Sequence, residues 1–167
     1  MNKYPINLIV AFDNNYLIGK DYEIPWDYPE DLKYFHEKTL NSTIVMGYRT
    51  MECLKKPLKD RINIVINREV HGMICENGFF HVNSLKKAIE YNNEYFHKEI
   101  FIIGGTKIYE EALLKLDLNL VFITKINKSF EGNVYFPKMA LLENYILDDS
   151  IRSNNHPELF YETWIKK

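Results

Sequence analysis

The sequence contains little that would crosslink the chain or anchor it to a membrane. It has only two cysteines, Cys53 and Cys75, and they form no CxxC pair. Nothing at the N-terminus is typical of a signal peptide, so we expect both cysteines to be reduced thiols in a cytoplasmic protein. No apolar run approaches the roughly 20 residues that a membrane-spanning helix needs. These absences favour a globular protein that works without a membrane.

Neither sign of charge is in excess, and no histidine pattern indicates a metal. Lys and Arg together number 21 and Asp and Glu 23, which gives a net charge of -2 and a pI near 6.2. We therefore do not expect nucleic acid as a partner, and an anionic ligand would have to be met by a few placed Arg or Lys side chains. The five histidines show no HxH or HxxxH spacing, so we expect no metal site.

What the sequence does contain fits one compact domain. It has 167 residues and is 46% hydrophobic, which is enough to bury a core without disulfides. We find no internal repeat, low-complexity tract or linker. We therefore predict a single domain over residues 1–167, acting as a monomer.

Short apolar runs that alternate with helical patterns predict an α/β fold. Runs rich in branched residues predict buried, mostly parallel strands at 6–12, 43–46, 62–66, 79–82, 100–103 and 118–126. Helical spacing predicts helices from 29 to about 40, with Leu32, Phe35, Thr39 and Leu40 as apolar positions, and at 47–54, 85 to about 93 and 107–114. The runs 145–151 and 159–166 predict a closing antiparallel pair. We expect loops at 13–24, as a mobile lid, and at 69–78.

The stretch from residue 18 to Phe35 predicts a carboxylate on an apolar helix face. Pro29 fits the first helical position, which puts Asp31 in the first turn. Asp31 lies four residues before Phe35, so both side chains project from the side that faces the core. An acidic residue here ordinarily complements the helix dipole, and spacing alone leaves that alternative open. Because Trp26 and two prolines crowd the approach, desolvation would raise the pKa of the carboxyl toward the range useful for acid chemistry.

Two glycine turns lie between predicted strands and helices. Gly47 follows the strand at 43–46, and Gly104 and Gly105 follow the most apolar strand, at 100–103. Such glycines bring backbone N–H groups close to phosphate, although a tight turn alone would explain the Gly-Gly pair about as well. Both turns fall on the carboxyl edge of one sheet, where ligands of such folds bind. We interpret the pair as a dinucleotide cradle that lacks the GxGxxG fingerprint.

The run Ile18-Gly19, Ile24-Pro25-Trp26, Pro29-Glu30-Asp31-Leu32 and Phe35 resembles the substrate-side signature of the dihydrofolate reductase family. Later motifs agree in order and spacing along nearly the whole chain: Met46-Gly47-x-x-Thr50, Pro57-Leu58-x-x-Arg61-x-Asn63-Ile64, Ile103-Gly104-Gly105-x-x-Ile108-Tyr109, Thr124 and Phe136-Pro137. The resemblance implies a mainly parallel eight-stranded sheet flanked by helices, an antiparallel C-terminal strand and a cis Gly104–Gly105 peptide. It also implies NADPH-dependent reduction of 7,8-dihydrofolate to tetrahydrofolate, which serves one-carbon metabolism and is a target of antifolates.

The same resemblance implies roles for individual residues. Asp31 would bind the pterin and assist protonation at N5, Trp26 would hold a relay water, and Thr124 would lie behind Asp31 by way of water. Arg61 would clamp the glutamate α-carboxylate. The other substrate-side residues implied are Ile9 and Ile103 through their carbonyls, Val10, Leu32, Phe35, Leu54 and Tyr109. The NADPH groove would be lined by Ala11, Ile18, Gly19, Gly47, Tyr48, Arg49, Thr50, Asn67, Arg68, Ile103, Gly104, Gly105, Thr106, Lys107, Ile108 and Tyr109.

Four positions depart from the family pattern, one of them Lys55, which replaces a usual glycine before Pro57. Tyr48 stands where a basic residue usually pairs with the 2′-phosphate of NADPH, and Arg49 and Arg68 are the candidates to supply that charge. Asn67 replaces a common serine nearby. Asn133 follows Gly132 where an acidic residue can stand, which leaves open how that loop couples to the lid.

Two other functions are compatible with the same overall pattern. One is the fold-sharing reductase of flavin biosynthesis, which acts on a ribosylamino-pyrimidine, and the other is a catalytically idle nucleotide-binding relative. The combination of Asp31, Trp26 and Arg61 favours a folate enzyme over both.

Overall fold

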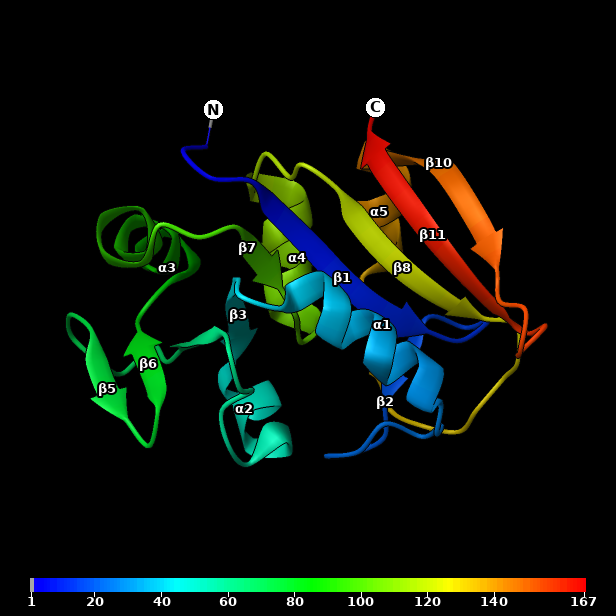
Figure 1. Cartoon of the computed structure of the whole chain (residues 1–167), viewed down its shortest axis with the longest axis horizontal. Helices are drawn as coiled ribbons and strands as arrows, with labels where there is room; N and C mark the ends of the chain where they lie inside the picture. Colours follow the sequence, from blue (N-terminus) through cyan, green and yellow to red (C-terminus); the bar gives the residue numbers. More distant parts are fainter. Residues whose placement is uncertain (1) are drawn as a thin grey trace.

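The central feature of the computed structural model, which describes residues 2–167, is a nine-stranded mixed sheet (Figure 1). Its strands are β1 (Ile6–Phe12), β3 (Thr43–Gly47), β4 (Ile62–Ile66), β5 (Ile74–Glu76), β6 (Phe79–Val82), β7 (Ile100–Ile102), β8 (Val121–Ile126), β10 (Tyr145–Arg152) and β11 (Leu159–Lys166). They are ordered β10-β11-β8-β1-β7-β3-β4-β6-β5. The six strands from β8 to β6 run parallel, and β5, β11 and β10 pair antiparallel.

The sheet has nine strands, one more than the sequence led us to expect. The additional strand, β5, lies in the predicted loop at 69–78 and pairs antiparallel with β6 at the sheet edge. All three of its residues are exposed, so no buried apolar pattern marks it in the sequence. The short strands β2 (Leu17–Gly19) and β9 (Val134–Tyr135) form a separate two-stranded sheet. Neither was predicted as a strand, and β2 lies in the predicted loop at 13–24. Strands of two or three residues are too short to show the period-two alternation that identifies a strand.

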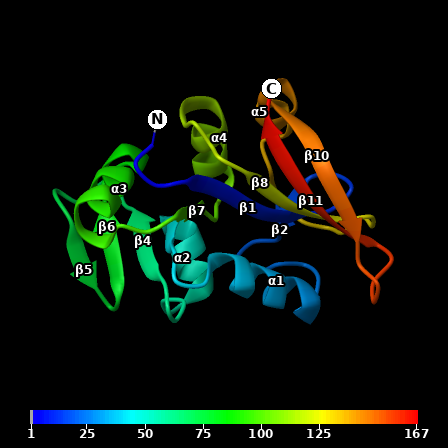
Figure 2. The same ribbon diagram turned by 45° about the horizontal axis from the view of Figure 1, so that its top comes forward.

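Within residues 2–167, helices cover both faces of the sheet, and Figure 2 shows the resulting three layers. On one face lie α1 (Pro29–Thr39) and α2 (Tyr48–Leu54), and on the other α3 (Leu85–Tyr91), α4 (Thr106–Lys115) and α5 (Lys138–Asn144). Helix α5 was not predicted. Helix α3 ends two residues earlier than expected because the chain continues as a π-helical turn, η1 (Asn92–Phe96).

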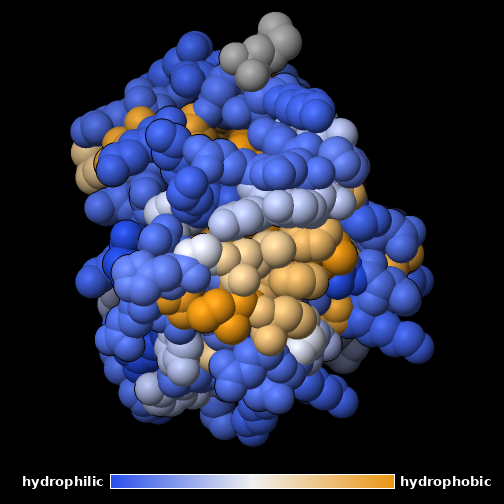
Figure 3. Space-filling model, turned by 90° about the vertical axis from the view of Figure 1, so that its left-hand side faces the viewer, coloured by the Kyte–Doolittle hydropathy of each residue, from blue (hydrophilic) through white to orange (hydrophobic). Residues whose placement is uncertain are grey.

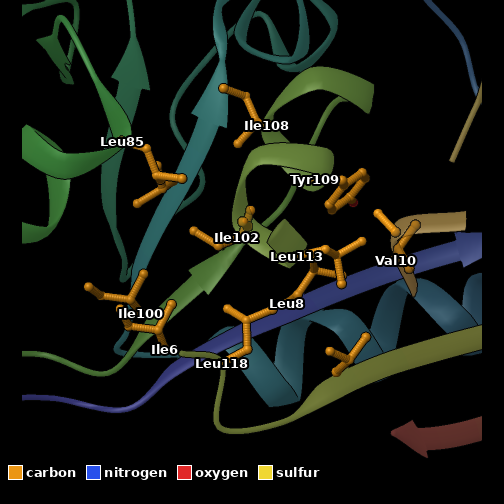
Figure 4. Packing of buried hydrophobic residues seen from close by; sticks show 14 of the residues in the cluster. Ile6, Leu8, Val10, Leu85, Ile100, Ile102, Ile108, Tyr109, Leu113 and Leu118 are labelled. Atoms are coloured by element: carbon orange, nitrogen blue, oxygen red, sulfur yellow. The ribbon is translucent and has the colours of Figure 1, made fainter. Parts of the chain in front are cut away.

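The larger of two hydrophobic clusters lies between the sheet and the layer formed by α3, α4 and α5 (Figure 4). Alternate residues of β1 point to opposite faces, so Leu8 and Val10 enter this cluster while Ile9 enters the other. Tyr109 and Leu113 of α4 pack onto the same side. A strand that is buried on both faces reads as a continuous apolar run, and burying each such side chain contributes about 1.5–3 kcal/mol. These contacts fix the strand ends that carry the ligand-facing loops.

The predicted lid, residues 13–24, is tied to the segment between β8 and β9. The Asp13 carboxylate is fully buried and accepts hydrogen bonds from two lid N–H groups and from the N–H of Phe130, the last at 2.9 Å. Asp21 and Asn133 form a reciprocal pair: the Asp21 N–H donates to Asn133 Oδ1 at 2.8 Å, and Asn133 Nδ2 donates to Asp21 Oδ1 at 3.0 Å. An amide both accepts and donates, so Asn133 couples this loop to the lid.

An apolar area is exposed at the β5 edge of the molecule (Figure 3). Ile74 of β5 is 45% exposed. On β6, Phe80 is the register partner of Cys75, and its ring lies 4.9 Å from that of Phe96, each partly buried. Scattered exposed apolar side chains are ordinary for soluble domains. In the part of the chain that the structure describes, no helix has the length and apolar character needed to span a bilayer.

Candidate active site

A large cleft of about 1530 Å³ opens at the carboxyl edge of the parallel strands. Its walls come from the C-terminal half of β1, from α1, from the starts of α2 and α4, and from the lid. Every residue that the sequence predicted for catalysis, substrate binding or cofactor binding lines this cleft. A single drug-sized ligand needs roughly 300–1,000 Å³. The cleft is therefore large enough for two ligands side by side.

The Asp31 carboxyl lies inside the cleft, on the side of α1 that faces the sheet. Thr124 Oγ1, from β8, donates to Asp31 Oδ1 at 2.6 Å. The contact is direct, whereas the sequence led us to expect a bridging water. Burial raises the pKa of Asp31, the Thr124 hydrogen bond opposes that rise, and the neighbouring charge of Glu30 adds to it. Asp31 is therefore a carboxyl that binds a proton more readily than an exposed aspartate does.

The adjacent carboxylate, Glu30, points away from Asp31 and toward the C-terminal hairpin. It accepts hydrogen bonds from Tyr161 Oη at 2.6 Å, Ser153 Oγ at 3.0 Å and Asn155 Nδ2 at 3.1 Å. The Tyr161 hydrogen bond is the main cause that lowers the pKa of Glu30. The surroundings thus raise the pKa of one carboxyl and lower that of its neighbour. Opposite shifts of this kind allow one carboxyl to act as an acid while the other stays ionised.

Apolar side chains surround Asp31, although not all predicted ones face the sheet. Phe35 and Leu54 pack beside the cluster on this face of the sheet and also line the cleft. Leu32 lines the cleft but is 59% exposed. It is the residue after Asp31 on the helix, so its side chain projects in a different direction from that of Asp31. Leu40 is 40% exposed because α1 ends at Thr39. The Trp26 ring lies 5.4 Å from that of Phe130 at the cleft wall.

Arg61 is held in place at the substrate side of the cleft. Its Nε donates to the Lys59 carbonyl at 2.9 Å, and its Nη1 donates to Thr39 Oγ1 at 3.0 Å. His36 Nδ1 lies 3.4 Å from Arg61 Nη2. Because these contacts leave some of its N–H groups unused, the guanidinium can still pair with a carboxylate.

The two glycine turns meet at the other end of the cleft. The Gly47 N–H donates to the Gly104 carbonyl at 2.7 Å, and the Gly104–Gly105 peptide is cis, as expected. A Cβ on Gly47 would lie 3.2 Å from Ile108 Cγ1, and one on Gly104, whose φ is +112°, would lie 3.0 Å from the Tyr109 ring. Side chains at these positions would therefore crowd the floor of the cleft.

The start of α4 offers free donors at this floor. No side chain among residues 2–167 caps this helix, so its first N–H groups keep their hydrogen bonds for a ligand. Together with the bare glycine backbone, this arrangement fits a pyrophosphate group. Tyr109 Oη donates to the Ile9 carbonyl at 2.8 Å, which leaves that carbonyl a second lone pair.

Tyr48 is 47% exposed and uncharged, and two arginines, Arg49 and Arg68, line the same cleft. The Arg49 guanidinium lies over the Tyr22 ring of the lid at 4.7 Å. Arg68 Nη2 lies 3.8 Å from Glu111 Oε2, and because the Arg68 side chain is exposed this ion pair is weak. Both arginines line the cleft, so both can reach an anion bound there.

Sequence reasoning missed several residues that line the cleft: Tyr22, Glu23, Tyr34, His36, Cys53 and Leu58. Tyr34 had a usable signal, because it follows Asp31 by three positions on the same helix face. No sequence pattern indicated Tyr22 and Glu23, because apolar residues do not recur at a regular spacing in the lid segment.

Comparisons with known proteins agree with this geometry. The family model described as dihydrofolate reductase matches residues 5–163. A dihydrofolate reductase of Buchnera aphidicola subsp. Acyrthosiphon pisum is 42% identical over 137 residues, which are 81% of each chain. One from Bacillus subtilis is 37% identical over 133 residues, or 80% of this chain and 76% of that protein.

A solved structure has the same fold. It is a dihydrofolate reductase from Enterococcus faecalis complexed with NADP(H) and RAB-propyl, and it superposes with a TM-score of 0.86 at 27% identity. The match covers 98% of this chain and 96% of that one. Sequence and structure agree over nearly the full length, so this chain belongs to the dihydrofolate reductase family.

Proposed function

We propose that this cleft reduces 7,8-dihydrofolate to 5,6,7,8-tetrahydrofolate with Asp31 as the group that assists protonation of N5. The observation that carries this assignment is the position of the Asp31 carboxyl, which lies inside the cleft with a raised pKa while Glu30 is turned away. A carboxyl that retains a proton at higher pH is better suited to deliver one. NADPH, when bound, supplies the hydride that adds to pterin C6.

The chain's own residues bind, orient and shield the substrate. Phe35 and Leu54 present apolar surface to the flat rings, and Trp26 holds the water through which a proton reaches N5. The Arg61 guanidinium pairs with the glutamate α-carboxylate. The carbonyls of Ile9 and Ile103 accept hydrogen bonds from the pterin and nicotinamide side. Orientation and exclusion of bulk water are the protein's contribution to the rate.

The glycine end of the cleft would hold the NADPH pyrophosphate. Gly47, Gly104 and Gly105 give close backbone approach, and the first turn of α4 supplies N–H donors. The remaining predicted cofactor residues also line the cleft. We infer a monomeric enzyme located in the cytoplasm, which size-exclusion chromatography and cell fractionation would test.

A steady-state assay of the purified protein tests the proposed reaction. Loss of NADPH absorbance is expected with dihydrofolate and not with a ribosylamino-pyrimidine. The opposite preference would identify the flavin-pathway reaction. An idle nucleotide-binding relative would consume NADPH with neither substrate, although it would still bind the nucleotide.

Replacing Arg49 and Arg68 together by alanine is expected to narrow the preference for NADPH over NADH. Tyr48 carries no charge, so these two guanidinium groups are the cations we assign to the 2′-phosphate. Two charge-assisted contacts are worth about 1.5–3 kcal/mol each, so the ratio of kcat/KM values should fall by at least roughly tenfold.

A control variant separates this effect from a loss of net charge. Lys86→Ala combined with Lys115→Ala removes the same charge from exposed positions on α3 and α4. It should leave the NADPH to NADH ratio unchanged. If the arginine pair also leaves the ratio unchanged, other residues discriminate between the two nucleotides.

A further inference from the structure

The Glu30 carboxylate is bound by a part of the chain far from it in sequence. Its three partners, Ser153, Asn155 and Tyr161, lie 123 to 131 residues away in the hairpin of β10 and β11. Helix α1 has no side-chain cap among residues 2–167, because its N-cap residue is Tyr28. The hairpin therefore supplies the hydrogen bonds that hold the first turn of α1.

Neighbouring strands hold the two adjacent carboxyls of this turn. Tyr161 on β11 is the direct register partner of Thr124 on β8. Tyr161 Oη donates to Glu30, and Thr124 Oγ1 donates to Asp31, each at 2.6 Å. Two short hydrogen bonds from a rigid sheet to successive residues leave the first turn little freedom to rotate about the helix axis.

The ring of Tyr161 is itself fixed by packing. It lies 4.5 Å from the ring of Tyr34, which is on the same helix, with an angle of 40° between the planes. Burial, then the hydrogen bond to Glu30, raises the pKa of Tyr161. The hydroxyl therefore stays protonated and donates throughout the range in which the enzyme works.

We propose that Tyr161, acting through Glu30, is a positioning residue that fixes the Asp31 carboxyl in the cleft and keeps Glu30 charged beside it. The inference rests on the proposed acid role of Asp31. It adds that the C-terminal hairpin, which contributes no side chain to the cleft, controls the orientation and protonation of the group inside it.

The charged and titratable groups around this pair are few. Glu30 faces Tyr161 and the more distant His156, and Asp31 faces Glu30, Tyr34 and Tyr161. Among these, Glu30 is the source of negative charge that raises the pKa of Asp31. Removing that charge should make Asp31 lose its proton at lower pH.

Two variants separate positioning from charge. Tyr161→Phe deletes one hydroxyl, and the hydride-transfer rate should fall about tenfold, less than the roughly hundredfold that a full ångström of misplacement can produce. NADPH affinity should not change. Glu30→Gln keeps the shape and an acceptor for Tyr161, and the fall in rate at alkaline pH should begin at lower pH than in the parent.

Tyr4→Phe is the matched control. Tyr4 Oη also makes one side-chain hydrogen bond, to His97 Nδ1 at 3.0 Å, and neither residue lines the cleft. This variant should lower the melting temperature slightly without moving the rate or its pH profile. Stopped-flow measurement of hydride transfer from pH 5 to 9 on all variants, with melting curves, gives the required data.

The possible outcomes distinguish a failure of this inference from a failure of the proposed function. If Tyr161→Phe and Glu30→Gln behave like Tyr4→Phe while Asp31→Asn is inactive, the hairpin is only structural and the inference is wrong. If Asp31→Asn itself turns over normally, the acid assignment fails first. A selective loss of rate in Tyr161→Phe, with a shifted pH profile in Glu30→Gln, supports the positioning role.

Discussion

Asp31→Asn is expected to slow hydride transfer at neutral pH by about a hundredfold or more while leaving NADPH affinity nearly unchanged. General acid catalysis by a placed side chain contributes roughly 10²–10⁴-fold, and an amide cannot replace a carboxyl in that role. Asp31 is bound by Thr124 of β8, whereas the glycine turns assigned to the nucleotide follow β3 and β7, which lie on the other side of β1 in the sheet. Single-turnover kinetics with dihydrofolate and fluorescence titration with NADPH would measure the two quantities separately.

The stability of the same variant provides an internal control. Burial raises the pKa of Asp31, so the folded protein binds this proton more tightly than the unfolded chain does. Folding stability contributed by this group therefore falls as pH rises from the ordinary aspartate pKa through the raised one. At neutral pH, Asp31→Asn removes a buried charge and should be at least as stable as the parent in urea unfolding. Comparable turnover in a folded variant would refute the acid assignment.

Arg61→Leu is expected to weaken dihydrofolate binding by about 2–3 kcal/mol, the worth of a charge-assisted pair, with little change in the Kd for NADPH. The guanidinium is already oriented by the Lys59 carbonyl and Thr39, so little ordering is needed when a carboxylate binds. Isothermal titration calorimetry with each ligand would measure both affinities.

Arg61→Lys completes that test, because it keeps the positive charge but loses the planar guanidinium group that can bind a carboxylate through two hydrogen bonds. It should bind dihydrofolate more tightly than the leucine variant and more weakly than the parent. Melting curves are needed alongside, since both substitutions remove hydrogen bonds to Thr39 and Lys59. A large loss of NADPH affinity with unchanged dihydrofolate affinity would move Arg61 out of the substrate site.

Short-range sequence patterns were enough to predict most of the fold and the residues that line the cleft. The apolar runs of the central strands, Pro29 at a helix start and glycines after Met46 and Ile103 each reflect a short-range preference of the backbone. Because parallel strands present their carboxyl ends at one edge, these signals also predicted that the loops after β3 and β7 would meet. The structure joins them through the Gly47 to Gly104 hydrogen bond.

The sequence by itself thus determined the strand and helix order, the apolar surfaces that pack together, and which residues reach the edge of the sheet. Only the tertiary structure decided how those residues are held. Thr124 touches Asp31 directly, Tyr161 binds Glu30, and Asn133 pairs with Asp21, each across at least 93 residues of sequence. The physical reason is that such contacts depend on strand register and helix orientation, which arise when the whole core packs. No short segment contains that information.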